Sequence, residues 1–358
     1  MNIEEYMRYA RHLVMPEIGE KGQNRLRDAK VLVVGCGGLG APVSLYLAAA
    51  GIGEIGLIDG DVVDLSNLQR QVLYKTSDVG QKKAEIAKQR LIDLNPNCKV
   101  TSYNCMLNNT NIREIFENYD YIVDATDNFS ARYLISDACV IFNKIHIYGA
   151  VFRFVGQVSV FDSRKGATYR TVFPVKPKQG QIVDSSEAGV LGVLPGFIGV
   201  IQATETIKLI LGIGECLINK LLIVDLLSMN IQIKTVCYEA TNEFIPDGSF
   251  SHPDYEYNNK ALKEISYDDF ISKRDSEKTL FLNVGLRNEI PSELHNSNTL
   301  HIPLESFYEN MHLLNKYKNN EIIVFCRHGI GSRRVADSLK IREFDVAWLK
   351  NGLIGQIK

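Results

Sequence analysis

The chain has 358 residues, of which 45% are hydrophobic and 23% are charged, and its formal net charge at pH 7 is -2. A chain of this length exceeds one ordinary small domain and has enough apolar side chains for more than one core, which predicts two domains. The nearly balanced charge gives no global attraction to nucleic acid or to an anionic membrane, so we expect neither as a partner.

The cysteine pattern and the N-terminal segment indicate the compartment. The seven cysteines are scattered, odd in number and free of CxxC pairs, which favours a reducing compartment over a disulfide framework. The first six residues are acidic and lack the basic and apolar regions of a signal peptide. The apolar run from Ala188 to Ile213 is interrupted by Pro195, Glu205 and Lys208, which favours buried core over a membrane span. We therefore expect a cytoplasmic protein.

Strand and helix patterns alternate through the first half of the sequence. Residues 4–27 mix charged and apolar side chains and predict one or two amphipathic helices. Further along, we expect strands over residues 31–34, 55–58 and 121–124 and helices over residues 41–50 and 82–94. This alternation implies a Rossmann-like α/β domain, with a mostly parallel sheet covered on both faces.

The composition changes between residues 239 and 259. Asn, Asp, Pro, Gly and Tyr dominate there without a sustained apolar period, which predicts a linker. A second α/β pattern follows, with expected strands over residues 280–284 and 322–325 and a helix over residues 332–339. We expect a first domain over residues 1–240, a linker over 241–259 and a small α/β domain over 260–358.

A glycine motif directly follows the first predicted strand. Its four glycines fit GxGxxG and are Gly35, Gly37, Gly38 and Gly40. Such glycines permit a tight turn, let the backbone approach phosphate and aim a helix N-terminus at the anion. The next strand delivers Asp59 and Asp61, and Asp59 lies roughly 20 residues after the glycines, where a ribose-binding carboxylate is expected. A nicotinamide-dependent dehydrogenase would share these features, so the motif alone predicts only nucleotide binding.

The residues that follow distinguish ATP from a dinucleotide. Arg70 can grip a phosphate with two donors, Asn67 can hold an oxygen, and Lys83 opens a helix from which it can reach polyphosphate. Asp127 comes just past the strand over residues 121–124, where open α/β sheets bind ligands, and a carboxylate there suits Mg²⁺. A dehydrogenase needs no such set, so the sequence predicts ATP and Mg²⁺.

At these residues the sequence resembles the ThiF/MoeB/HesA family, the bacterial relatives of ubiquitin-activating enzymes. The resemblance runs from about Arg8 to Asp225. The motifs that carry it are Arg8–Arg11, Gly35–Gly40, Asp59–Gln71, Asp78–Lys83, Asp124–Asn128, Gly156-Gln157 and Glu187–Gly192. The family's chemistry implies attack on the α-phosphate of ATP by the C-terminal glycine carboxylate of a ubiquitin-fold sulfur-carrier protein ending in Gly-Gly. The products would be a protein acyl-adenylate and pyrophosphate.

The resemblance also implies roles for individual residues. By position, Asp59 would bind the ribose, Asn67, Arg70 and Lys83 the phosphates, and Asp127 the magnesium ion. Carboxylate and phosphate repel each other, so the cations and the metal must offset their charge while the site positions them.

Arg11 would reach into the neighbouring subunit's site, which implies a homodimer. An alternative is a pseudoenzyme, a scaffold that binds ATP or a carrier protein without turnover, and the intact phosphate and metal residues argue against it. Related activators serve molybdopterin, thiamine, tRNA thiolation and specialised pathways, and the sequence leaves this choice open.

The chain departs from the family at two places. Many relatives bind zinc with two CxxC pairs, but Thr168 and Thr171 occupy the first pair's positions and lone Cys237 lies near the second, so we expect no zinc site. Some relatives place an acceptor cysteine where this chain has Ser185. A hydroxyl is a poor substitute for a thiolate without an adjacent base, so we expect Ser185 to be a loop residue.

The last hundred residues or so resemble a rhodanese domain. Its key loop, Cys326–Ser332, lies between a predicted strand and a predicted helix. The resemblance implies a Cys326 thiolate stabilised by loop amides, the helix N-terminus and Arg327, Arg333 or Arg334, with a cysteine desulfurase as candidate sulfur donor. Gly331 stands where active relatives often have arginine, so an inactive docking domain is the alternative.

Overall fold

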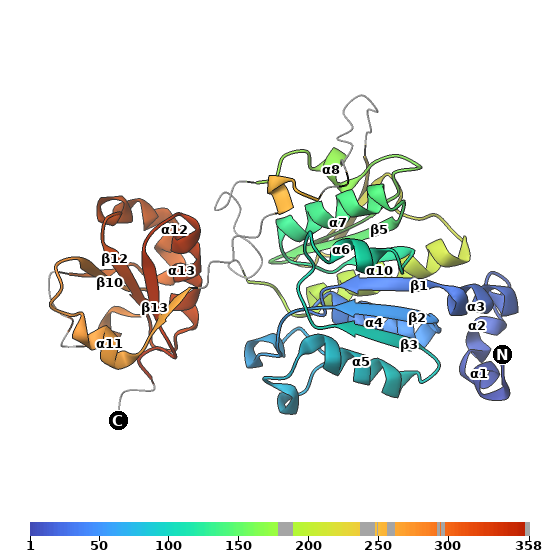
Figure 1. Ribbon diagram of the computed structural model, residues 1–358, viewed down its shortest axis with the longest axis horizontal. Helices are drawn as coiled ribbons and strands as arrows, with labels where there is room; N and C mark the ends of the chain where they lie inside the picture. The colour runs from blue at the N-terminus through green and yellow to red at the C-terminus, as the bar shows by residue number, and fades with distance from the viewer. Residues whose placement is uncertain are drawn as a thin grey trace. The chain divides into compact units, whose positions relative to one another are not determined.

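In the computed structural model of the protein, the described residues are 1–177, 189–236, 248, 250–255, 262–291, 294 and 298–354. Ser185 and Cys237 lie outside these ranges. The chain divides into two compact units, each described here by itself (Figure 1). The first comprises Met1–Lys176 and Ala188–Tyr257, and the second comprises Pro177–Glu187 and Asn258–Lys358.

An eight-stranded sheet forms the centre of the first unit, in the order β3-β2-β1-β4-β5-β6-β7-β8. The strands are β1 (Lys30–Val34), β2 (Glu54–Ile58), β3 (Lys99–Tyr103), β4 (Tyr121–Asp124), β5 (Ile145–Phe152), β6 (Val155–Phe161), β7 (Lys220–Asp225) and β8 (Asn230–Thr235). The strands from β3 to β5 are parallel, whereas β5 to β8 pair antiparallel. The strand order reverses between β1 and β4, which is where sheets of this kind bind ligands beyond the carboxyl ends of their strands.

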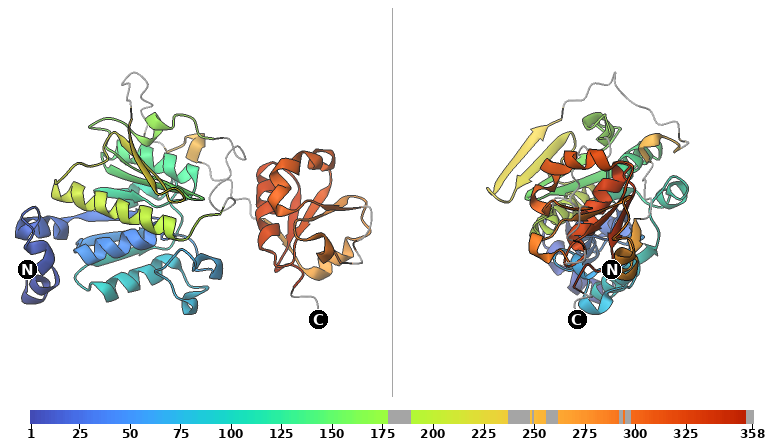
Figure 2. Two further views of the ribbon diagram at one scale, coloured as in Figure 1. Left: turned by 180° about the vertical axis from the view of Figure 1, so that it is seen from behind. Right: turned by 90° about the vertical axis from the view of Figure 1, so that its left-hand side faces the viewer.

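Helices cover both faces of this sheet. Within the described residues, the helices of the first unit are α1 (Ile3–Arg8), α2 (Ala10–Leu13), α3 (Gly19–Asp28), α4 (Gly40–Ala50), α5 (Lys83–Leu94), α6 (Ile112–Phe116), α7 (Phe129–Ile141), α8 (Tyr169–Val172) and α10 (Val193–Leu211), with 3-10 turns η1 (Leu65–Asn67), η2 (Thr76–Asp78) and η4 (Pro253–Tyr255). Val31 and Val33 join the core under α4, α5 and α10, which Figure 2 shows side by side, whereas Leu32 and Val34 join the core under α6 and α7. Burial on both faces explains the continuous apolar run of β1.

Helix α10 is the apolar run that the sequence assigned to the core. Among the described residues it is the one helix long and apolar enough to cross a membrane, yet half of the apolar window is buried and it packs against α4, β5 and β6. Its charged residues are paired, because Lys208 Nζ lies 2.6 Å from Glu205 Oε1 and Glu205 Oε2 accepts a hydrogen bond from the Leu217 amide. These contacts are those of a core helix.

The second unit is built on a parallel five-stranded sheet in the order β11-β10-β12-β13-β9. Its strands are β9 (Lys263–Ile265), β10 (Thr279–Asn283), β11 (Thr299–His301), β12 (Glu321–Phe325) and β13 (Val346–Leu349), and its helices include α11 (Tyr267–Ser272), α12 (Phe307–Asn310) and α13 (Ile330–Ile341). Ile322 and Val324 face one core, while Ile323 and Phe325 face the other. Cys326 therefore stands directly between the end of β12 and the start of α13.

Part of the segment predicted as a linker packs on the first unit. Phe250 is 5% exposed, joins the core under α6 and α7, and stacks on Phe142 with ring centroids 5.9 Å apart. Tyr255, in η4, donates a hydrogen bond of 2.6 Å to the carboxylate of Asp137 on α7. Composition alone hides these contacts, because the aromatic side chains are scattered among turn-forming residues.

Candidate functional site

The glycine loop follows β1 and packs tightly against the loop between β4 and α7. Gly35 has a φ of +94°, and a Cβ there would lie 2.7 Å from the carbonyl oxygen of Ala125. A Cβ at Gly40 would lie 1.9 Å from the Gly35 oxygen. Only glycine fits these two positions, and the turn they form aims the N-terminus of α4 outward from the sheet edge, where it favours an anion.

Asp59 lies beside this loop at the carboxyl end of β2. Its carboxylate accepts hydrogen bonds of 2.8 Å from the backbone amides of Cys36 and Asp61. Burial raises the pKa of Asp59, and the positive charge of Lys83 and the two amides partly offset that effect. The structure therefore brings the predicted ribose-binding carboxylate and the glycine loop together.

Lys83 and Asp61 form an ion pair next to Asp59. Lys83 is the first residue of α5, and its Nζ lies 3.0 Å from Asp61 Oδ2. The Lys83 side chain is only 7% exposed, whereas that of Asp61 is 64% exposed. The ammonium group is therefore held by packing and by a partner that reaches solvent.

Asn67 is the last residue of the 3-10 turn η1, and Arg70 follows it by three residues. Arg70 Nη1 donates 3.1 Å to the carbonyl oxygen of Ser66, and Asn67 Oδ1 accepts 3.3 Å from the amide of Asp64. A Cβ at Gly38 would lie 3.5 Å from Arg70 Cγ, which places the arginine stem against the glycine loop. The other two guanidinium nitrogens of Arg70 carry most of its N–H donors and can donate them to phosphate oxygens.

Asp127 is exposed just past the end of β4. Within the described part of the chain, no group of three or more His, Cys, Asp and Glu side chains could hold a metal ion by itself. Mg²⁺ typically takes one or two carboxylates and completes its shell with water and substrate phosphates. A single exposed carboxylate beside a nucleotide site therefore fits an ion that arrives with ATP.

Arg11 is not brought to this cluster within one chain. It is exposed on α2, which packs against α1 and α3. Helix α3 ends directly before β1, so these helices lie at the amino end of the strand, while the glycine loop lies at its carboxyl end (Figure 1).

Three residues to which the sequence analysis gave no role line or support the site. The Tyr74 hydroxyl donates 2.7 Å to the Cys36 carbonyl and so holds the glycine loop from below. Gln71 is 4% exposed, and its amide nitrogen lies 3.5 Å from where a Gly37 Cβ would be. Arg132 is 8% exposed and donates 3.1 Å to the Thr126 carbonyl from α7. Gln71 is the last residue of the motif Asp59–Gln71, and Arg132 follows the motif Asp124–Asn128 by four residues, so both had a signal in the sequence.

Thr168 and Thr171, at the positions of a CxxC pair in zinc-binding relatives, form a reciprocal cap on α8. The Thr168 amide donates 2.8 Å to Thr171 Oγ1, and the Thr171 amide donates 3.2 Å to Thr168 Oγ1. Both hydroxyls are therefore used to satisfy the helix terminus.

A buried ionic network lies next to this cap. Arg170 donates from Nη2 to Asp137 Oδ2 at 2.6 Å and from Nη1 to Asp254 Oδ2 at 2.7 Å, and its guanidinium lies 4.7 Å from the ring centroid of Tyr133. The Arg170 side chain is 8% exposed and that of Asp137 is 2% exposed. Arg170 thus ties α8 both to α7 and to the segment after β8.

In the second unit, Cys326 is 8% exposed, and its Sγ lies 3.4 Å from Oγ of Ser332 in the first turn of α13. The Ser332 amide donates 3.3 Å to Cys326 Sγ, in agreement with the expected loop-amide contact. The guanidinium of Arg333 lies 5.5 Å from the ring centroid of Trp348, and its role at the thiolate stays a prediction. The aromatic face offers that cation a local partner, which the loop pattern did not reveal. Arg327 and His328 are exposed.

Comparisons with known sequences agree with this geometry. Residues 9–243 match the ThiF family. The chain is 38% identical over 365 residues to a probable molybdopterin-synthase adenylyltransferase of Porphyra purpurea, which covers 98% of this chain and 93% of that protein. It is 46% identical over 238 residues to the sulfur carrier protein adenylyltransferase of Thermus thermophilus, covering 65% of this chain and 88% of that protein.

Two further similarities concern a two-function relative and a solved structure. The chain is 46% identical over 237 residues to the probable adenylyltransferase/sulfurtransferase MoeZ of Mycobacterium tuberculosis, covering 65% of this chain and 60% of that protein. It also resembles the crystal structure of E. coli MccB with ATP, with a TM-score of 0.56 and 26% identity over 63% of this chain and 68% of that chain.

Proposed function

Because the chain belongs to the ThiF family, we propose that it is an ATP-dependent adenylyltransferase that activates the C-terminal glycine carboxylate of a small ubiquitin-fold sulfur-carrier protein. The observation that carries this proposal is one cluster at the carboxyl ends of β1, β2 and β4. There the glycine loop, the Asp59 carboxylate and the Lys83 ammonium lie together, with Arg70 against the loop.

Each group has a role that follows from its chemistry. The glycine loop and the N-terminus of α4 attract the phosphates, and the Asp59 carboxylate can accept hydrogen bonds from the ribose hydroxyls. Lys83 and Arg70 offset the charge that builds up when a carboxylate attacks the α-phosphate. Attack forms a carboxylate–phosphate bond and breaks the bond to the β-phosphate, so pyrophosphate leaves with the electron pair of that bond.

We assign Asp127 as the protein ligand of Mg²⁺. When bound, the ion would neutralise phosphate charge and orient the leaving pyrophosphate. Asp127 itself contributes an exposed carboxylate on a loop whose backbone packs against the glycine loop at Gly35. This packing links the metal-side and phosphate-side halves of the site.

We propose that two chains form a homodimer in which Arg11 completes the partner's site. Arg11 is exposed at the amino end of β1, whereas its own chain's glycine loop is at the carboxyl end. An arginine so placed can serve a phosphate site of a second copy.

The six cysteines within the described residues are free thiols, which supports the proposed cytoplasmic location.

For the second unit we propose sulfur transfer to the activated carrier through Cys326, with a cysteine desulfurase as donor. The supporting observation is a thiol at the junction of β12 and α13 that accepts a hydrogen bond from a loop amide.

A scaffold that binds ATP and the carrier without turnover is the competing function. Arg70 bonds Ser66 through Nη1 alone, which leaves its other donors for phosphate and argues against the scaffold.

Carrier-dependent ATP–pyrophosphate exchange tests the proposal. The full chain is mixed with ATP, Mg²⁺, labelled pyrophosphate and a ubiquitin-fold carrier ending in Gly-Gly. Label should enter ATP only when the carrier tail is intact, and a carrier lacking its last glycine is the control. Tight carrier and ATP binding without exchange would establish the scaffold instead.

A further inference from the structure

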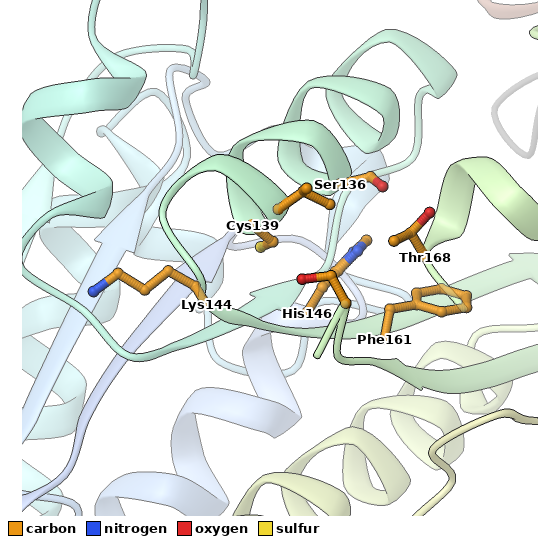
Figure 3. A pocket seen from close by; sticks show the side chains of 8 residues that line it. Ser136, Cys139, Lys144, His146, Phe161 and Thr168 are labelled. Atoms are coloured by element: carbon orange, nitrogen blue, oxygen red, sulfur yellow. The ribbon is translucent and has the colours of Figure 1, made fainter. Parts of the chain in front are cut away.

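A small cavity lies behind the site in the first unit, between α7, β5 and the start of α8 (Figure 3). Its lining includes Ser136, Cys139, His146, Phe161 and Thr168. The space open to the centre of a water molecule is about 10 Å³. That volume suits one water molecule and excludes a nucleotide or a peptide.

Two polar atoms at this cavity have no hydrogen-bond partner among the described residues. His146 is 1% exposed and Ser136 is 2% exposed, and both His146 Nδ1 and Ser136 Oγ are buried without a hydrogen bond. Leaving a buried polar atom without a partner is costly, so native proteins pair such atoms with protein groups or with ordered water. Figure 3 shows both side chains at the cavity, whereas the ammonium end of Lys144 extends away from it.

The other nitrogen of His146 is committed to a buried carboxylate. His146 Nε2 lies 3.1 Å from Oδ2 of Asp124, which is fully buried at the end of β4. When Nε2 carries the proton and donates it to Asp124, Nδ1 is an acceptor and requires a donor. The Ser136 hydroxyl has both a proton and lone pairs, so a single water can accept from it and donate to Nδ1.

The Asp124 carboxylate in turn holds the loop that carries Asp127. Its Oδ1 accepts from the Thr126 amide at 3.0 Å and from the Thr126 hydroxyl at 2.6 Å. The carbonyl group of Ala125, the residue before Thr126, packs against Gly35. The position of His146 therefore bears on both the glycine loop and the neighbouring loop.

We propose that this cavity binds one ordered water that bridges Ser136 Oγ and His146 Nδ1, and that His146 is a positioning residue for the loop bearing Asp127. The water fixes the ring so that Nε2 points at Asp124, and Asp124 then restrains Thr126. The catalytic part of this inference rests on the proposed adenylyl transfer, whereas the water site does not.

The water site is tested by a high-resolution crystal structure of the full chain and of its Ser136→Val variant. We expect density for one water within hydrogen-bonding distance of both atoms in the parent protein, and none in the variant, where a methyl group fills the space. Ser136→Ala and His146→Phe should also lower the melting temperature by less in combination than the sum of their separate effects. A dry cavity or strictly additive effects would overturn the water bridge.

The positioning role is tested by exchange kinetics. His146→Phe should lower kcat by about tenfold or more, because the loop is displaced, while the KM for ATP changes little. His146→Gln, which can present an amide N–H to Asp124, should recover most of kcat. His301→Phe, at a half-buried histidine of the second unit that bonds Gly285, is the matched control.

The positioning role of His146 and the water site can fail independently. An unchanged kcat in folded His146→Phe, or equal losses in Phe and Gln variants, would overturn the positioning role. If no carrier supports exchange by the parent protein, the proposed function fails, and the density and melting data still decide the water site.

Discussion

The ammonium group of Lys83 lies 3.0 Å from the carboxylate of Asp61, at the point where α5 begins. The Lys83 stem is buried, so its Nζ has little freedom to leave the cluster. Asp61 is mostly exposed and can turn toward solvent when a phosphate competes for the same ammonium group. The pair thus keeps a cation in place beside Asp59 without burying a second charge.

We expect Lys83→Gln to lower kcat for carrier-dependent exchange by about 10²- to 10³-fold, because one cation at the phosphates is lost. Initial-rate exchange at saturating ATP measures this. Lys82→Gln changes an exposed neighbouring lysine and should stay within about twofold of the parent protein, the range expected away from the site. Equal effects of the two substitutions would contradict the assignment of Lys83.

Asp127→Ala and Arg70→Ala should each abolish measurable exchange while leaving the fold intact. The first removes the proposed magnesium ligand and the second a phosphate donor, and both groups act where charge develops. Exchange assays with circular dichroism as a folding check decide the matter. Asp93→Ala, at an exposed carboxylate on α5, serves as the control. Exchange near the parent level in both site variants would refute the assignments.

Three of the five parallel strands of the first unit, β1, β2 and β4, were predicted from the sequence. The strand 31–34 is apolar on both faces and is followed at once by Gly35, so its burial and its end are both encoded locally. Strands β3 and β5 to β8 were not predicted. The sequence of β8 alternates, with Ile231 and Ile233 between polar residues, yet all residues of this strand are exposed, so the pattern there does not mark a buried face.

The site shows a similar division. The glycine loop, Asp59 and Lys83 follow a local motif, and the structure brings them together. The Arg170 network could not be predicted, because its partners Asp137 and Asp254 lie 33 and 84 residues away along the chain. Nothing in the local pattern links positions so distant.

Arg11 should act in the partner subunit. Heterodimers of Arg11→Ala and Asp127→Ala chains should recover activity that neither homodimer has, because one of the two sites would then be intact. Differently tagged chains allow the heterodimer to be isolated and its exchange rate measured, with about half the parent rate expected if sites act independently. Heterodimers that form but stay inactive would exclude an arginine acting between subunits.

Arg170→Ala should destabilise the first unit by about 3–5 kcal/mol, because the Asp137 carboxylate would be left buried without its cation. Urea unfolding monitored by circular dichroism measures this loss in the free energy of unfolding. Arg27→Ala is the matched control, since the side chains of Arg27 and of its partner Asp28 are 46% and 76% exposed and their pairing should contribute about 1 kcal/mol or less.

The same region yields a prediction about metal. With Thr168 and Thr171 occupied in capping α8, we expect no stoichiometric zinc and no change in melting temperature with a chelator. Elemental analysis after dialysis measures zinc directly. One zinc per chain that resists dialysis would overturn this prediction.

Cys326→Ser should stop sulfur transfer to the carrier and leave pyrophosphate exchange unchanged, because adenylation is assigned to the first unit. The thiol accepts the Ser332 amide and lies next to Gly331, where a Cβ would be 3.8 Å from Sγ, so no side chain at that position covers it. Gly331 also supplies no cation for an anionic donor such as thiosulfate, where active relatives often have arginine. We therefore expect weak persulfide formation with thiosulfate and more with a cysteine desulfurase.

Intact-mass spectra of the full chain measure persulfide formation on Cys326 as the mass of one added sulfur. The control is Cys105→Ser, which removes an exposed thiol. A persulfide forms when the Cys326 thiolate attacks the outer sulfur of the donor. The desulfurase thiolate leaves from its persulfide, and sulfite leaves from thiosulfate, so no outside oxidant is required. Failure of both donors to add sulfur would favour a domain that only docks the carrier. Loss of exchange in Cys326→Ser would instead show that adenylation depends on the second unit, and the division of labour between the two units would have to be abandoned.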